Sequence, residues 1–95
     1  MVISLKAAAQ ESYKPPPGFV PDSATAIGIA VAVRVPIYGK KQIDSEKPNI
    51  ATLMGGVWTV VETFHCPVSQ HCVGGVALAE ISKGDGTILK VIHGL

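Results

Sequence analysis

The clearest pattern of hydrophobic and polar positions lies between residues 47 and 64, and it predicts a β-hairpin. Ile50, Thr52 and Met54 alternate with Ala51 and Leu53, and Gly55-Gly56 then supplies two positions that tolerate a positive φ, as a tight hairpin turn requires. The return strand divides its side chains between two faces: Trp58, Val60, Glu62 and Phe64 on one, and Val57, Thr59, Val61 and Thr63 on the other. Because both faces carry apolar residues, we expect this strand to be central in its sheet and partly covered on each side.

A helical pattern precedes the hairpin. The motif Pro21-Asp22-Ser23 predicts a helix start, because an aspartate or serine side chain can accept hydrogen bonds from free backbone N–H groups. Apolar residues occupy almost every position of 24–33, which predicts a largely buried helix. Pro36 removes a backbone donor and clashes with the preceding turn, so the regular helix is expected to end near Arg34. Residues 40–46 are expected to add one or two further helical turns.

Two more strands follow the hairpin. Alternating side chains predict a third strand over 73–82 and a fourth over 87–93, joined by the glycine-containing turn 83–86. Gly74-Gly75 indicates a bulge or a close backbone approach near the start of the third strand. The predicted fold class is α+β: one main N-terminal helix packed on a curved four-stranded antiparallel meander, a roll of the cystatin-like kind.

The bulk properties fit one small domain of 95 residues. We assign residues 1–20, which contain the run Pro15-Pro16-Pro17, to an N-terminal arm, linker or disordered tail, and residues 21–95 to the domain. Eight Lys and Arg against seven Asp and Glu give a net charge of +1, which provides no electrostatic footprint for nucleic acid or an anionic membrane. No apolar run approaches the roughly 20 residues that span a bilayer. The N-terminus lacks the features of a signal peptide, so we expect a cytoplasmic protein, or a periplasmic one if an export signal has been removed.

The polar loop His65–Cys72 carries two His-Cys pairs, and several chemistries remain open for it. Cys66 and Cys72 can form a disulfide if the two strand ends are neighbours and the compartment is oxidising, or they can remain free thiols. Together with His65 and His71 they offer a donor set that zinc accepts, but the spacing between the cysteines is not that of a standard zinc knuckle, so no metal site is predicted. A cysteine–histidine nucleophile pair lacks an orienting third group. We therefore predict no cofactor and no catalytic residue here.

Glu62 and His93 fall on the strand faces assigned to the core. A carboxylate and an imidazole lining a residual pocket could perform acid–base chemistry, so a small-ligand binder or enzyme using this pair is the alternative function. We favour the simpler interpretation that both residues lie near strand ends and are half solvated, because no further carboxylate, Tyr or Arg is evident beside them.

Six short motifs, in order and spacing, resemble those of small immunity proteins with a nuclear-transport-factor-2-like (NTF2-like, cystatin-like) fold. The motifs are Ile37-Tyr38-Gly39-Lys40, Glu46-Lys47-Pro48, Val57-Trp58-Thr59-Val60, Gly74-Gly75-Val76-Ala77, 81–86 and 89–94. Such proteins accompany bacterial polymorphic toxins, including Rhs-type and type VI secretion effectors, and the resemblance covers about residues 22–95. It implies a non-enzymatic protein that binds one cognate toxin. The His65–Cys72 loop looks longer than the corresponding link in the family.

A protein that binds a toxin tightly needs an anchor cluster with a polar rim. The 65–72 loop is the first candidate surface, with Phe64, His65, Val68 and His71. The segment 38–46 is the second, with Tyr38, Lys40, Lys41 and Asp44. A third class of function, pairing with a second copy through the two open edges of the sheet, also fits the predicted fold.

Overall fold

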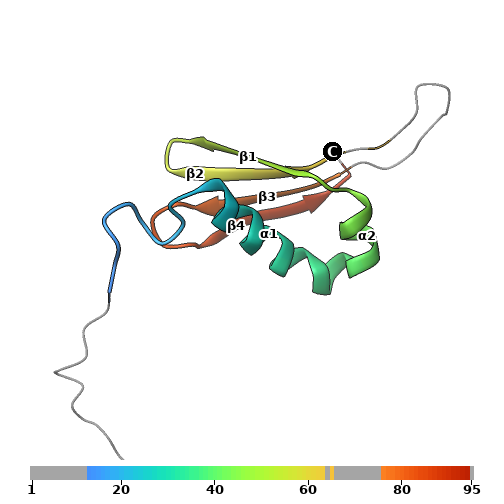
Figure 1. The fold of residues 1–95 in the computed structure, drawn as a ribbon, viewed down its shortest axis with the longest axis horizontal. Helices are drawn as coiled ribbons and strands as arrows, with labels where there is room; N and C mark the ends of the chain where they lie inside the picture. The colour runs from blue at the N-terminus through green and yellow to red at the C-terminus, as the bar shows by residue number, and fades with distance from the viewer. Residues whose placement is uncertain (1–12, 64, 66–75, 95) are drawn as a thin grey trace, which may run out of the picture.

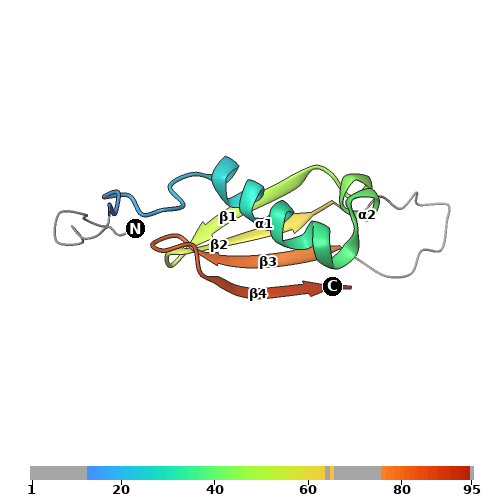
Figure 2. The same cartoon turned by 90° about the horizontal axis from the view of Figure 1, so that it is seen from below.

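The computed structural model of this protein describes residues 13–63, 65 and 76–94. Its elements in chain order are α1 (Ser23–Tyr38), α2 (Lys40–Ser45), β1 (Asn49–Met54), β2 (Val57–Glu62), β3 (Ala77–Ser82) and β4 (Ile88–His93). Among these residues the strands form one antiparallel sheet in the order β1-β2-β3-β4. Both helices lie on the same face of the sheet, as the two views in Figures 1 and 2 show. The predicted α+β meander with its N-terminal helix is confirmed.

The β1–β2 hairpin has the predicted turn. Gly55 and Gly56 adopt φ of 57° and 76°, and the register runs from Met54 opposite Val57 to Asn49 opposite Glu62. Along β2 the side chains alternate between buried and half-buried positions. The strand is therefore central, with its Trp58 face turned to the core, as the pattern predicted.

The β3–β4 hairpin forms the other half of the sheet. Ala77, Ala79 and Ile81 of β3 are buried, and a register shift against β4 occurs between Glu80 and Ile81. The predicted bulge at Gly74-Gly75 lies outside the described residues. The fourth strand begins at Ile88, one residue later than expected.

The helix α1 is buried along one stripe, so the expectation of a largely buried helix is wrong. Only Ala26, Ala30 and Arg34, spaced by four residues, are fully buried in it. A four-stranded sheet covers one side of the helix, and no described element packs on the other side (Figure 2). The small side chains of the two alanines let the helix approach the sheet closely. The core cluster consists of Val20, Ala26, Ala30, Trp58, Val60, Ala79 and Ile81.

The helix also continues through Pro36 to Tyr38, four residues beyond the expected end at Arg34. Pro36 has no N–H to donate to the Ala32 carbonyl, so one helical hydrogen bond is missing, yet the helix continues for two residues beyond it. Gly39 ends the helix with φ of 91°, and its N–H donates to the Val35 carbonyl over 2.8 Å. The predicted further turns form α2, which follows immediately.

The segment before α1 pairs with the turn between β3 and β4. The N–H groups of Phe19 and Val20 donate to the carbonyls of Gly84 and Lys83, each over 3.0 Å. The Val20 side chain is fully buried, and its carbonyl accepts from Trp58 Nε1 over 2.8 Å. Although residues 1–20 were assigned to an arm, the part of it next to α1 thus contributes to the core. No helix in the described ranges is long and apolar enough to cross a membrane.

Candidate functional site

A row of polar side chains crosses the helix-facing side of the sheet, at the end nearest α2. Asn49 and Glu62 are direct cross-strand partners on β1 and β2, and His93 ends β4 opposite Ala77. The Glu62 residue is only 3% exposed. The hairpin register therefore brings a carboxylate under the helices, where burial is costly unless partners are present.

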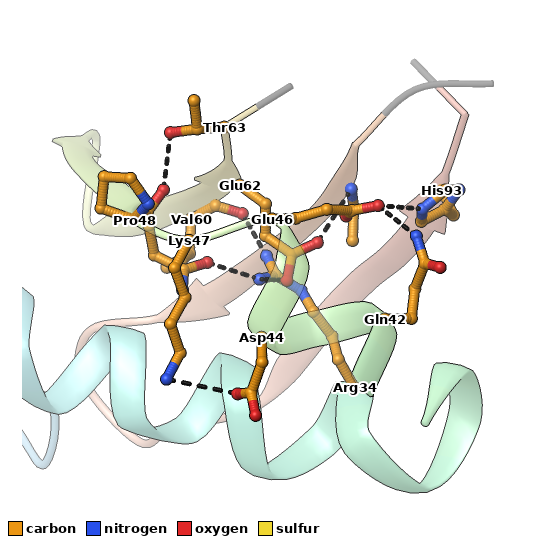
Figure 3. Close-up of polar contacts among 12 residues, drawn as sticks. Arg34, Gln42, Asp44, Glu46, Lys47, Pro48, Val60, Glu62, Thr63 and His93 are labelled. Atoms are coloured by element: carbon orange, nitrogen blue, oxygen red, sulfur yellow. Dashed lines mark hydrogen bonds and ion pairs between the residues drawn. The ribbon is translucent and has the colours of Figure 1, made fainter. Parts of the chain in front are cut away.

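Arg34 supplies the main cationic partner for this row (Figure 3). It follows Ala26 and Ala30 on the buried stripe of α1, and its guanidinium reaches over β2. Nη1 donates to Asn49 Oδ1 over 2.8 Å and lies 3.6 Å from Glu62 Oε2, while Nη2 donates to the Val60 carbonyl over 2.5 Å. The side chains of Arg34 and Glu62 are fully inaccessible, so the ion pair is completely buried.

The helix α2 brings a second carboxylate to the cluster. Glu46, which follows α2, is 7% exposed, and its Oε2 accepts from Gln42 Nε2 and lies 3.4 Å from His93 Nε2. The His93 side chain is 26% exposed and its ring lies 5.1 Å from that of Tyr38, at the end of α1. Figure 3 shows Glu46 reaching between Glu62 and His93. The cluster thus ties both helices to three strands of the sheet.

The two carboxyl groups differ in their affinity for a proton. Burial and the hydrogen bond with Glu46 raise the pKa of Glu62 to about 7, against the lowering effect of the Arg34 charge. Burial opposes ionisation of Glu46 as well, but hydrogen bonds with Glu62, His93 and Gln42 leave its pKa below the ordinary value. Glu46 Oε1 and Glu62 Oε2 are buried and accept no hydrogen bond from a fixed donor. One proton held by Glu62 provides the missing donor, so we infer that the pair shares a single proton near neutral pH.

The prediction that Glu62 is half solvated is wrong, because the helices cover the end of β2 that carries it. His93 lies at the rim as expected, and it contacts Glu46 rather than Glu62. No cavity is found among the described residues, and no group of three or more His, Cys, Asp or Glu side chains there could hold a metal ion. The polar partners of Glu62 and Arg34 in the described part of the chain are protein groups, and this arrangement suits a structural role.

The corner between α1 and α2 carries the second predicted contact surface. Lys40, Lys41 and Asp44 lie on α2, and Tyr38 at the end of α1 is half-buried against His93. Asp44 accepts from Lys40 Nζ over 2.5 Å and pairs with Lys47 Nζ over 3.2 Å. These exposed ion pairs contribute little stability. They leave more positive than negative charge on the surface of the corner.

Most of the first predicted surface lies outside the described residues: Phe64, Cys66, Val68, His71 and Cys72. The proposed disulfide and the zinc alternative fall there too. His65 is described and exposed, and its Nε2 lies 2.5 Å from the Lys47 carbonyl. This contact places His65 close to the segment that links α2 to β1.

The sequence interpretation missed Arg34 and Glu46. Arg34 follows the helical spacing from Ala30 that places it on the buried stripe, but the sequence interpretation did not connect it with Glu62. Asn49 opposite Glu62 also follows from counting outward from the two-residue turn. Glu46 gave no such signal, because its position depends on how α2 turns away from α1.

A helix packed on a curved antiparallel meander, with its polar cluster buried at one end, defines a small roll of the NTF2-like class. Residues 25–94 match the model of a protein family described as NTF2 fold immunity protein. The chain belongs to this family, which confirms the resemblance seen in the sequence. It is also 36% identical over 75 residues to the uncharacterized protein YhhH of Escherichia coli (strain K12). That match covers 79% of this chain and 57% of YhhH, so the chain spans little more than half of that relative's length. No solved structure matches the chain.

Proposed function

We propose that this chain is a non-enzymatic immunity protein that binds one cognate secreted toxin and blocks it by direct contact. The match of residues 25–94 to the NTF2 fold immunity family carries the proposal. The buried side chains of Arg34, Glu46 and Glu62 pair with one another and with neighbouring protein groups, which supports the proposal. A cluster of this kind stabilises the fold, so contact with a partner is the task of residues on the outer surface. The toxin would be of the polymorphic kind, such as an Rhs-type or type VI secretion effector.

The α1–α2 corner, defined by Ile37, Tyr38, Lys40, Lys41 and Lys47, is the described surface best suited to such contact. Ile37 is 57% exposed and offers an apolar anchor, and Tyr38, the next residue, is half-buried. The three lysines suit an acidic patch on the toxin, and complementary charge accelerates association and excludes wrong partners. The 65–72 loop remains a second proposed contact from the sequence.

The test is co-expression in the bacterial cytoplasm with the toxin domain encoded by the adjacent gene. The chain is expected to restore growth and to bind the purified toxin domain in a calorimetric titration. Lys41→Glu should weaken binding by about tenfold or more, equivalent to about 1.4 kcal/mol. The matched variant Lys14→Glu, which reverses an exposed charge far from the corner along the chain, should bind like the wild type. Absence of both protection and binding would remove the proposal.

A variant at the buried cluster distinguishes this function from the enzyme alternative. Glu62→Gln preserves the size of the side chain and should keep full protection against the toxin, provided that the variant is folded. If the cell were protected by acid–base catalysis at Glu62 and His93, the same variant would lose protection while still binding the toxin.

A further inference from the structure

The sheet face opposite the helices carries an uninterrupted row of aliphatic side chains. The cross-strand registers align one residue from each strand: Ile50, Val61, Leu78 and Ile92. Ile50 is 61% exposed and Ile92 is 38% exposed on the two edge strands. Side chains of an antiparallel sheet that face water are commonly polar, so this row indicates a surface that another molecule covers.

The rest of this face contains little charge. The next row along the strands is Thr52, Thr59, Glu80 and Lys90, and the row beyond it contains Met54, Val57 and Ser82. Glu80 and Lys90 are direct cross-strand partners of opposite sign. In the described part of the chain both helices lie on the other face (Figures 1 and 2). We call these three rows the open face.

We propose that a second copy of this chain packs on the open face, related by a two-fold axis that runs parallel to the strands between β2 and β3. Such an axis leaves each row at the same position along the strands, so that it faces the same row of the partner. It places β1 over the partner's β4 and β2 over the partner's β3. Ile50 then lies over the partner's Ile92, and Val61 lies over the partner's Leu78. The two aliphatic rows merge into one apolar layer, as in two aligned sheets packed face to face.

The charges on the open face select this axis over the other in-plane two-fold. With the axis parallel to the strands, Glu80 lies over the partner's Thr59, and Lys90 lies over the partner's Thr52. With the axis perpendicular to the strands, Glu80 and Lys90 each lie over the same residue of the partner, and the aliphatic row lies over the Met54 row. Like charges directly opposed are unfavourable, so only the first arrangement is self-complementary. The chain's net charge of +1 adds little repulsion between copies.

The size of the open face predicts how tight the pairing is. Four strands about 4.8 Å apart and six residues long span roughly 19 by 20 Å. The projected area of about 400 Å² per copy is smaller than the roughly 800 Å² per partner of a standard interface. We therefore expect a dimer that dissociates on dilution through the micromolar range.

Sedimentation velocity of the whole chain over a concentration series tests the proposal. The wild type should shift from monomer to dimer as concentration rises. Ile50→Glu should raise the dissociation constant at least tenfold, because it places a charge in the apolar layer. Ile37→Glu is the matched control: the same substitution at a residue with similar exposure on α1, 57% against 61%. It should leave the dissociation constant within twofold of the wild type. Circular dichroism melting confirms that each variant is folded.

A second substitution identifies the axis. Ile50→Glu/Ile92→Lys brings opposite charges together at both ends of the proposed interface and should recover much of the dimerisation that Ile50→Glu loses. Dimerisation through the edge of β1, or about the perpendicular axis, gives no recovery, because the two positions then never meet. A wild type that stays monomeric at all concentrations, equal sensitivity to Ile37→Glu, or the absence of recovery would each overturn the proposal. A monomer whose Ile50→Glu variant loses toxin binding would instead assign the open face to the toxin.

Discussion

Substituting Glu62 with glutamine should remove most of the pH dependence of the free energy of unfolding. The side chain keeps its size, its carbonyl oxygen can accept from the Ala77 N–H as Glu62 Oε1 does over 3.3 Å, and its amide can donate to Glu46. Glutamine therefore mimics the protonated form of Glu62. What the variant loses is the ability to ionise inside the cluster.

The sign and size of the effect follow from the two pKa values of Glu62. Its pKa rises from the ordinary value of 4.5 to about 7 in the folded protein. Between these values the folded state binds more protons than the unfolded state, so stability is fully present below pH 4.5 and is lost as pH rises through 7. At about 1.4 kcal/mol per pH unit, the loss over this interval of about 2.5 units amounts to roughly 3.5 kcal/mol at most. Glu46 has a lowered pKa and acts in the opposite sense, but its contribution is lost only as pH falls below its ordinary value.

Urea unfolding at several pH values from about 5 to about 8 measures this effect, with the fluorescence of the single, buried Trp58 as the probe. The wild type should lose roughly 2–3 kcal/mol across the range, and Glu62→Gln should lose much less. Glu80→Gln, which changes a half-buried carboxylate on the open face, is the control and should keep the wild-type dependence. The protein is held at a concentration where it is monomeric. The reasoning would be refuted if the free energy of unfolding changed equally with pH in the wild type and in Glu62→Gln. It would also be refuted if the wild type became more stable as the pH rose over this range.

Two other substitutions probe the packing of α1 and of the segment before it. Arg34→Met should cost about 3–5 kcal/mol in urea unfolding at neutral pH, because the buried carboxylates lose their cation, and less at low pH; a loss below about 1 kcal/mol would contradict the buried ion pair. Gly18→Ala should destabilise by about 2 kcal/mol or more, since Gly18 has φ of 94° and an added Cβ would meet the Lys83 carbonyl oxygen at 2.5 Å. Its control, Gly28→Ala in the exposed middle of α1, meets nothing within 4 Å and should stabilise by about 0.5–1 kcal/mol. Equal effects of the two alanines would refute the packing of this segment.

The elements that the sequence predicted correctly depend on neighbours in the chain. The hairpin turn needs two residues with positive φ, and Gly55-Gly56 meets that need locally. The alternation along β2 identifies its core face without knowledge of the partner strands. The start of α1 depends on the Asp22 carboxylate, which accepts from the Thr25 N–H over 2.8 Å.

The errors arise where contacts between distant segments outweigh the local pattern. An almost wholly apolar helix predicts extensive burial, but a single sheet fully buries only the stripe through Ala26, Ala30 and Arg34. Pro36 predicts a helix end, but α1 continues past it to Tyr38 and ends only at Gly39. The run Pro15-Pro16-Pro17 predicts a free arm, yet the residues that follow it pair with the β3–β4 turn because Val20 fills the core.

Arg34 illustrates why the candidate site could be predicted only in part. Its place on the buried stripe could be derived from helical spacing, and the pairing of Asn49 with Glu62 could be derived from the hairpin. A buried guanidinium must find acceptors, so the two patterns together would have indicated that the arginine and the glutamate meet. The proton shared by Glu62 and Glu46 could not be derived in this way, because it requires the turn of α2 over the sheet, and that turn is set by the fold as a whole. The pH dependence of stability is therefore a test of the tertiary arrangement rather than of any local pattern.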